Sequence, residues 1–418
     1  METTKSISRP ELGERELIAM MASIMSLQAF GIDAMLPALG AMASDLGAPG
    51  NDRQLIIAAY LLGSGIGALL PGAFADRFGR RPVLFFGLTF YFIMSIACSL
   101  VTDFETLVAM RAIQGVGSAA LTVLPATIVR DRVSGDRMAR LMSLIAMTFM
   151  LVPLLAPAIG QAILTIASWR VIFDAMAVVG ALVALWAWWR LPESLRSEDR
   201  QPLEIKAIAI NMVRGVSDRS ALGYILGSAL VFGALFGFLN SSQQLIGETF
   251  GAGEDFALIF GAMVSGLVLA SFTNSRIVER FGARRVSHTA LLGIIVISGV
   301  QVWSASQAEQ TLWQFVPLMA INLALLGFIG ANFSSIALQP FMHMAGTASS
   351  GQTFLRMVTG ALLGGAIGQA FDGTARPIAM ALLVCGLLAL VLVLWSERGK
   401  LFRRPTPPGT RHEVSSTR

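Results

Sequence analysis

Residues 72–87 read GAFADRFGRRPVLFFG, a stretch in which a tight group of charges separates two strongly apolar runs. Within six positions the chain places one acid and three arginines, namely Asp76, Arg77, Arg80 and Arg81. The runs on either side are apolar enough to lie in a membrane, where ionised side chains are costly. The group therefore predicts a short turn in water between two membrane-spanning segments.

The composition of the whole chain supports this setting. Of its 418 residues, 55% are hydrophobic and only 14% are charged, with a mean hydropathy of +0.68. A soluble globular chain carries about 25% charged residues, so this chain lacks the polar surface that water would require. Apolar stretches of about 20 residues recur, which is the length of a membrane-spanning helix. Because they lack the alternation of β-barrel strands, we expect an all-α integral membrane protein.

We expect twelve transmembrane helices and an internal repeat. DRFGRRPV at 76–83 resembles ERFGARRV at 279–286, and the offset of 203 residues is about half of the chain. The longest polar stretch, 191–219, lies between the two copies and predicts a cytoplasmic linker. The expected spans are 17–39, 54–75, 82–101, 105–129, 138–166, 170–190, 221–247, 256–276, 286–305, 312–337, 348–371 and 376–396. The expected domains are an N-terminal six-helix half (1–190), the linker (191–219), a C-terminal six-helix half (220–397) and a basic cytoplasmic tail (398–418).

The distribution of positive charge predicts the orientation in the membrane. With both termini on one face, that face carries 26 of the 31 Lys and Arg residues, whereas the opposite face carries only Arg53, Arg170 and Arg376. This asymmetry favours cytoplasmic termini. The net charge of +5 is therefore expected to reflect topology in a lipid bilayer and not nucleic-acid binding.

Six segments, in order along the chain, resemble motifs of one transporter family. GAFADRFGRRPVL resembles the loop between helices 2 and 3 of the major facilitator superfamily, whose architecture is a pair of six-helix halves. RAIQGVGSA at 111–119 and MLVPLLAPAIGQAI at 150–163 resemble the helix-4 and helix-5 motifs of its drug:proton antiporters. Three segments resemble the bicyclomycin/chloramphenicol-resistance (Bcr/CflA) branch: GIDAMLPAL at 31–39, SWRVIF at 168–173 and LPESL at 191–195.

The resemblance implies that the charged loops form a gate on the cytoplasmic side. Asp76 lies at the C-terminal end of a helix, where the helix dipole disfavours an anion, so we expect it to have a partner. The candidates are the adjacent arginines or the start of the eleventh helix at 346–351, where Thr347 is a candidate N-cap. By symmetry, Glu279 is expected near the start of the fifth helix, around Ser134–Arg137. The alternative is a solvated loop that only sets topology. The expected gate residues are Gly72, Asp76, Arg77, Gly79, Arg80, Arg81, Glu279 and Arg280.

Ionisable residues inside the spans point to a transport pathway or an ion pair. Asp33 and Arg111 lie roughly 10 Å and 9 Å from the outer ends of their helices, given the helical rise per residue. Burial disfavours the charged form of a carboxyl group and a nearby cation favours it, so a carboxylate under both influences can load and release a proton. We expect Asp33 to be the proton-coupling acid and Arg111 to modulate it. The alternative is a fixed ion pair that holds two helices together.

Substrate recognition is expected to rest on neutral polar side chains within the spans, with flexible methionines nearby. Arg356 is a third charge within a span, and two roles are open for it. It faces the cavity and favours anionic or polar substrates, or it joins the gate around Asp76. The candidate cavity residues are Gln28, Gln114, Asn240, Gln244, Asn322 and Arg356.

The fifth helix carries the motif residues Pro153, Pro157 and Gly160. The family pattern here is Gly-Pro-x-x-Gly-Gly, in which Ala156 replaces the first glycine and Gln161 the last. A proline inside a helix removes a backbone donor and bends the helix, and we expect this bend at Pro157. The resemblance associates the bend with antiport and not with import.

The sequence carries no signal of an enzyme or of an ATP-driven pump. Cys98 and Cys385 fall within spans, and no phosphate-binding loop of the G-x-x-x-x-G-K-[ST] form occurs, so we expect neither a metal nor a cofactor. We expect a monomer in the bacterial inner membrane that exports small amphipathic drugs or toxic metabolites in exchange for protons. The alternative is an importer of a small metabolite or sugar with the same fold.

Overall fold

The computed structural model is helical in all of the regular structure that it describes, which covers residues 12–133, 135–200, 218–307 and 310–403. The expectation of an all-α membrane protein is confirmed. In this part of the chain, ten helices are long and apolar enough to span a membrane, and a bent pair makes an eleventh span. The remaining expected span, 348–371, is also a helix, but Arg356 and several Gly, Ser and Thr residues make it less apolar.

Two groups of helices follow the order of the chain. The N-terminal half contains α1 (Glu14–Asp33), α2 (Leu39–Leu46), α3 (Leu55–Gly67), α4 (Pro71–Phe78), α5 (Arg80–Ser99), α6 (Phe104–Arg132), α7 (Gly135–Phe149), α8 (Val152–Leu164) and α9 (Arg170–Arg190). The C-terminal half contains α11 (Arg219–Gln243), a π-helical turn (Gln244–Thr249), α12 (Phe256–Phe281), α13 (Ala283–Ala305), α14 (Leu312–Leu338), α15 (Ala345–Gln369) and α16 (Arg376–Ser396). Short 3₁₀ turns occupy Leu36–Ala38, Asp52–Gln54, Ser197–Asp199 and Gln339–Met344.

Three of the expected spans are broken, and a proline lies at each break. Pro37 lies in the 3₁₀ turn between α1 and α2, Pro71 begins α4, and Pro153 lies in the first turn of α8. Because proline lacks a backbone N–H, a helix begins readily at a proline but loses a hydrogen bond by continuing through one. The segments around α3 and α4 meet at 44°. The fifth helix is interrupted before Pro153, one turn earlier than the expected bend at Pro157, which lies inside α8.

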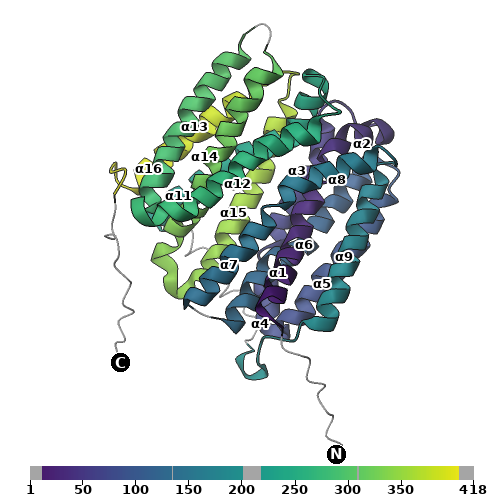
Figure 1. Ribbon diagram of the computed structural model, residues 1–418, viewed down its shortest axis with the longest axis vertical. Helices are drawn as coiled ribbons and strands as arrows, with labels where there is room; N and C mark the ends of the chain where they lie inside the picture. Colours follow the sequence, from purple (N-terminus) through teal and green to yellow (C-terminus); the bar gives the residue numbers. More distant parts are fainter. Residues whose placement is uncertain (1–11, 134, 201–217, 308–309, 404–418) are drawn as a thin grey trace, which may run out of the picture.

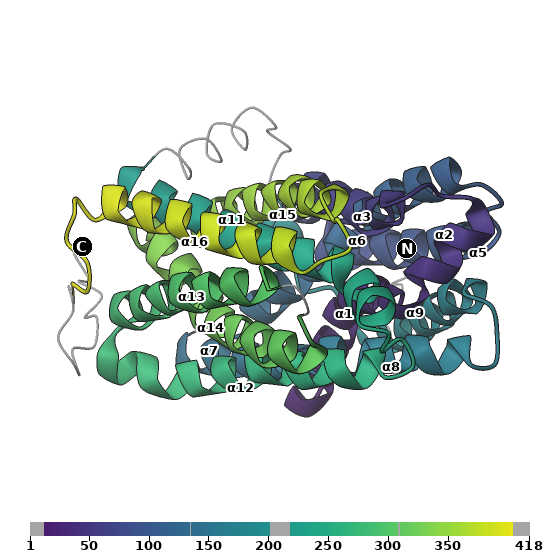
Figure 2. The same cartoon turned by 90° about the horizontal axis from the view of Figure 1, so that it is seen from above.

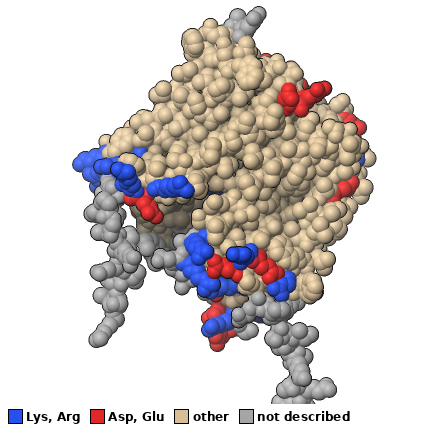
Figure 3. Space-filling view, viewed as in Figure 1, with Lys and Arg blue, Asp and Glu red and all other residues tan. Residues whose placement is uncertain are grey.

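Lys and Arg side chains gather on one side of the molecule, here named the basic end. Figure 3 shows them in two groups, one near α4 and the other near the end of α16 (compare Figure 1). The opposite side, here named the far end, carries Arg53 just before α3, Arg170 at the start of α9 and Arg376 at the start of α16. The exposed cations of the basic end include Arg77, Arg137, Arg140, Arg285, Arg398 and Lys400.

The two halves lie side by side (Figures 1 and 2), with α3 against α15 and α8 against α12. Glycines permit the contact between α3 and α15. A Cβ added at Gly65 would lie 3.0 Å from Met357, and one added at Gly368 would lie 1.5 Å from the Gln54 side chain. These contacts extend from the middle of the two helices to the far end, whereas α4 bends at the opposite end of α3.

A glycine contact within the N-terminal half gives a test of the packing. A Cβ at Gly63 of α3 would lie 2.0 Å from the carbonyl oxygen of Ala112 in α6. We expect Gly63→Ala to lower the free energy of unfolding by about 1–3 kcal/mol, because the two backbones must separate. Thermal unfolding of the purified protein checks this. Gly72→Ala is the matched control, since its Cβ meets no atom within 4 Å; equal midpoints for the two variants would contradict the packing.

Candidate functional site

Arg111 is a fully buried cation that supports the end of α1. Its Nη2 donates to the carbonyl oxygen of Gly31 at 2.7 Å, its Nη1 donates to Gln114 Oε1 at 2.5 Å, and its guanidinium lies 4.0 Å from the ring centroid of Tyr60. Gly31 belongs to the last turn of α1, where carbonyl groups lack helical partners and the dipole favours a cation. Arg111 thus provides a hydrogen-bond donor for a carbonyl group at the end of α1, and its own charge is not paired with a carboxylate.

Two of the three glutamines that were expected to face a substrate bind side chains within the N-terminal half. Gln114 donates to Ser95 Oγ at 2.8 Å, and Gln28 donates to Ser64 Oγ. Both glutamines are buried, and these bonds join helices within the N-terminal half. Their amide groups therefore serve helix packing in this structure.

Asp33 is the last residue of α1 and only 6% exposed. Within the described residues its carboxyl group makes no hydrogen bond and no ion pair, so the fixed Asp33–Arg111 pair does not occur. Helix geometry explains the separation: Asp33 lies two residues after Gly31, about 200° around the helix. Gly31 faces the hydroxyl groups of Tyr60 and Tyr91, and Asp33 therefore points away from that cluster.

The fifth-helix motif lies against the backbone that follows Asp33. A Cβ at Gly160 of α8 would meet the carbonyl oxygen of Ala34 at 1.8 Å and Pro37 at 3.2 Å. On another face, Leu154 of α8 lies 3.5 Å from the Cβ position of Gly261 in α12. α8 thus connects the C-terminal half with the neighbourhood of Asp33.

A polar network joins the two halves at the far end. Arg53 donates to both carboxylate oxygens of Glu248, at 2.5 Å and 2.8 Å, and Asn51 donates to the carbonyl oxygen of Phe371 at 2.8 Å. The amides of Gln54 and Gln244 lie 2.6 Å apart, so Gln244, an expected cavity residue, belongs to this network. None of the motifs quoted from the sequence predicts this network. Its signal was a pair of polar segments next to apolar runs on the same face, NDRQ at 51–54 and SSQQ at 241–244.

The charged loop between α4 and α5 binds within its own half. Arg80 contacts Asp76 at 2.5 Å and Asp131 at 2.9 Å, and Glu193 accepts from the backbone N–H of Arg80 at 2.9 Å and of Arg81 at 3.1 Å. Gly79 allows the turn because its φ is +104°, a value that other residues rarely adopt. The adjacent arginine is thus the observed partner of Asp76.

Two expected gate contacts involve side chains that the structure does not describe. The side chains of residues 342–348, including Thr347, and of residues 134–136 lie outside the described residues, so neither the contact of Asp76 nor that of Glu279 with these helix starts is described. Arg77, Glu279 and Arg280 are exposed at the basic end. Gly72 has open space around its Cβ position and makes no close helix contact here.

The corresponding end of the C-terminal half contains a second polar cluster. Arg284 donates to Glu397 at 2.6 Å, and the Tyr224 hydroxyl donates to the same carboxylate oxygen at 2.7 Å. His288 Nε2 lies 2.9 Å from that hydroxyl, while its Nδ1 accepts from the backbone N–H of Phe402 at 3.1 Å. Because Nδ1 accepts, Nε2 carries the ring proton and donates to Tyr224. The cluster fixes the chain that follows α16.

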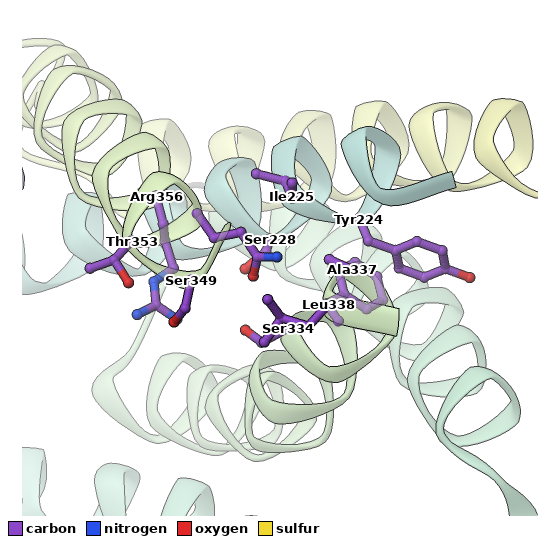
Figure 4. Close-up of a pocket in the computed structure, with 11 residues that line it drawn as sticks. Tyr224, Ile225, Ser228, Ser334, Ala337, Leu338, Ser349, Thr353 and Arg356 are labelled. Atoms are coloured by element: carbon purple, nitrogen blue, oxygen red, sulfur yellow. The ribbon is translucent and has the colours of Figure 1, made fainter. Parts of the chain in front are cut away.

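The remaining expected cavity residues have different surroundings. Asn322 donates to Gln301 at 2.7 Å and accepts from Ser298 at 3.3 Å, so it joins α13 to α14. Asn240 is buried in α11, and neither atom of its amide has a hydrogen-bond partner. Arg356 lines a pocket between α11, α14 and α15 (Figure 4), with its guanidinium 5.1 Å from the Phe232 ring centroid. Arg356 thus lies in this pocket of the C-terminal half, and both roles left open for it stay predictions.

Residues 21–368 match the Major Facilitator Superfamily, and the chain belongs to this family. A bicyclomycin resistance protein homolog from Haemophilus influenzae is 29% identical over 375 residues, which cover 90% of this chain and 94% of the relative. The multidrug resistance protein MdtL from Escherichia coli is 28% identical over 396 residues, which cover 92% and 96%. A crystal structure of a D-xylose–proton symporter superposes with a TM-score of 0.69 at 15% identity, over 92% of this chain and 99% of that one, and this likeness concerns the fold alone.

The family resemblance drawn from the motifs is thereby confirmed, including its likeness to bicyclomycin and multidrug resistance proteins. The protein is a multi-pass membrane transporter and not an enzyme.

The support of α1 by Arg111 gives a second prediction. We expect Arg111→Lys to lower the free energy of unfolding by about 1–3 kcal/mol, because a lysine cannot bind Gly31 and Gln114 in the same fork and stack on Tyr60. Thermal unfolding in detergent measures the change. Arg77→Lys, at an exposed position, is the control and should leave the midpoint unchanged. A loss no larger than that of the control would show that the fork does not hold α1.

The far-end network gives a third prediction. We expect Glu248→Gln to raise the fraction of molecules in which the two halves are separated at the far end, by up to about fivefold. The reason is that removing a partly exposed ion pair costs about 1 kcal/mol. Spin labels at the exposed positions Ser44 and Glu254 report the separation. Asp103→Asn, which alters the N-cap of α6, is the control. An unchanged distance distribution in Glu248→Gln would show that the Arg53–Glu248 ion pair does not hold the far end closed.

Proposed function

We propose that the protein exports small amphipathic drugs or toxic metabolites in exchange for protons, by alternating access across the bacterial inner membrane. The observation that carries the proposal is Asp33, a buried carboxyl group without a partner in the described residues, whose chain neighbour Ala34 contacts the fifth-helix residue Gly160. The names of the bicyclomycin and multidrug resistance relatives support the substrate class. The gradient supplies the energy, so no cofactor is needed, and the monomer is the functional unit.

The orientation and state follow from the two ends of the molecule. We assign the basic end to the cytoplasm, because positively charged residues are retained there. The far end, held by Arg53–Glu248 and its neighbours, is the closed gate, and Asp76 binds Arg80 within its own half. These contacts support an inward-facing state, in which the charged loop is available for the other half when the inner side closes.

Coupling follows from the cost of moving an unpaired carboxylate through a closed, water-free state. A proton or a bound cationic or amphipathic solute lowers that cost, so the two compete for the same form of Asp33. Arg111 acts indirectly by holding the last turn of α1 through Gly31. Rocking of α12 against α8 changes the contact between Gly160 and Ala34, which links the gates to the surroundings of Asp33.

An importer of a small metabolite or sugar is the second candidate. It is favoured by the structural likeness to a D-xylose–proton symporter, although that likeness concerns only the fold. Asp33 serves proton symport equally well in physical terms. The direction of solute movement relative to the proton distinguishes the two.

The fourth prediction tests coupling directly. In everted vesicles with an imposed proton gradient, chloramphenicol-like and cationic compounds should cause proton release by the wild type, read with a pH-sensitive dye. Asp33→Asn should abolish this release at an equal protein level, because the amide cannot exchange a proton. Asp174→Asn, an exposed acid in α9, is the matched control and should retain it.

The outcomes separate the candidates. Release that survives Asp33→Asn would move the coupling acid elsewhere. Proton movement in the same direction as the solute, measured with a labelled sugar or metabolite, would overturn export in favour of import.

A further inference from the structure

A pocket inside the C-terminal half has the chemistry of an anion site. It encloses about 110 Å³ between α11, α14 and α15. A single water needs about 10–15 Å³ on the same measure, so a small charged group with its waters fits. Figure 4 shows Arg356 beside Ser349 and Thr353 of α15, with Ser228 of α11 and Ser334 of α14 also at the pocket.

The pocket contains positive charge and unsatisfied donors. Its lining residues include no carboxylate, and Arg356 has no acidic partner within the described residues. Arg356 Nε and Gln352 Nε2 are both buried without a hydrogen-bond partner. A guanidinium has only donors, and in the described residues no hydroxyl or amide oxygen accepts from Arg356 Nε, unlike the buried Arg111, which has two neutral acceptors.

The energetics favour an anionic occupant over an empty pocket. A buried cation without a counter-ion is costly, and the stacking of Arg356 on Phe232 offsets this only in part. An oxyanion supplies the missing charge and accepts from the planar fork of the guanidinium as well as from Gln352. The hydroxyl groups of Ser228 and Ser334 complete the set of donors.

We propose that this pocket binds the oxyanion group, a carboxylate or a sulfate- or phosphate-like group, of a small ligand through Arg356 and Gln352. As a statement about substrates, the inference rests on the proposed function and adds an anionic group to the amphipathic solute; as a statement about binding, it is independent of proton coupling.

The pocket lies close to the boundary between the two halves. Ser349 lies roughly 6 Å and Arg356 roughly 16 Å from the start of α15, given the helical rise, so the pocket extends inward from the basic end. Met357, the next residue, contacts Gly65 of α3 at the boundary between the halves. On its other side the pocket includes Tyr224, which binds Glu397. A ligand on Arg356 therefore lies between the half boundary and the polar cluster of the C-terminal half.

The test is binding to the purified full-length protein, without a proton gradient. Thermal unfolding is followed by tryptophan fluorescence during titration with sodium sulfate, sodium 1-naphthoate or neutral 1-naphthamide, at an ionic strength held constant with sodium chloride. We expect a saturable rise of the midpoint with at least one anion and none with the amide. A response to naphthoate alone identifies the carboxylate of an organic solute, and a response to sulfate identifies a free inorganic anion, as the occupant.

Variants separate the site from general salt effects, because sulfate stabilises many proteins by exclusion. Arg356→Gln should abolish the saturable rise, and Gln352→Met should weaken binding about tenfold through the loss of one donor. Arg276→Gln is the matched control, since Arg276 is an exposed arginine of the same half that lies over Phe272. The proposal is overturned if no anion gives a saturable rise, or if the rise persists in Arg356→Gln. If that variant does not fold, undiminished binding in Gln352→Met overturns it.

This design distinguishes the two proposals. Arg356-dependent binding without any substrate-induced proton release supports the site and counts against antiport. Proton release without Arg356-dependent binding supports antiport and counts against the anion site.

Discussion

The hydrogen bond from Arg111 to the Gly31 carbonyl oxygen is the interaction on which the N-terminal half depends. In lipid, a helix that ends inside the protein must satisfy its last carbonyl groups there, and a buried cation must find acceptors. One contact meets both needs, and Gln114 and Tyr60 complete the surroundings of the guanidinium. Because a carbonyl group serves as the acceptor, the Asp33 carboxyl group is not consumed as a counter-ion.

The two halves repeat this internal architecture with different side chains. Ser95 binds Gln114 between α5 and α6, and Ser298 binds Asn322 between α13 and α14, at nearly the offset that relates the charged loops. Each half also has an acid after its last helix, Glu193 or Glu397, that binds the loop at its basic end. The repeat ends at two charges. Within the described residues, Asp33 of the N-terminal half has no partner and Arg356 of the C-terminal half has no acidic partner.

The sequence predicts the helices well, because length and apolar composition determine membrane spans directly. It predicts the breaks poorly, since the bend of the fifth helix depends on which proline begins a new segment, and Pro153 rather than Pro157 does so. Asp33 and Arg111 stand out as charges in apolar runs. Their separation arises because Arg111 binds Gly31, and Asp33, two residues later, points to another side of the helix, which composition does not reveal. Gln244 looked like a cavity residue because an amide in a span is ambiguous until its neighbours, here Gln54 and Asn51, are known.

The independence of Asp33 from the structural network has an evolutionary consequence. An acid that also held two helices together would be difficult to replace, since each change would cost stability as well as activity. Here Arg111 holds the last turn of α1 through Gly31, so we expect a neutral residue in place of Asp33 to leave the helices and the glycine contacts intact. If Asp33 couples transport to protons as proposed, a descendant exchanges concentrative pumping for passive, downhill exchange in a single mutational step. The energy source of such a transporter is therefore a more easily changed trait than its architecture.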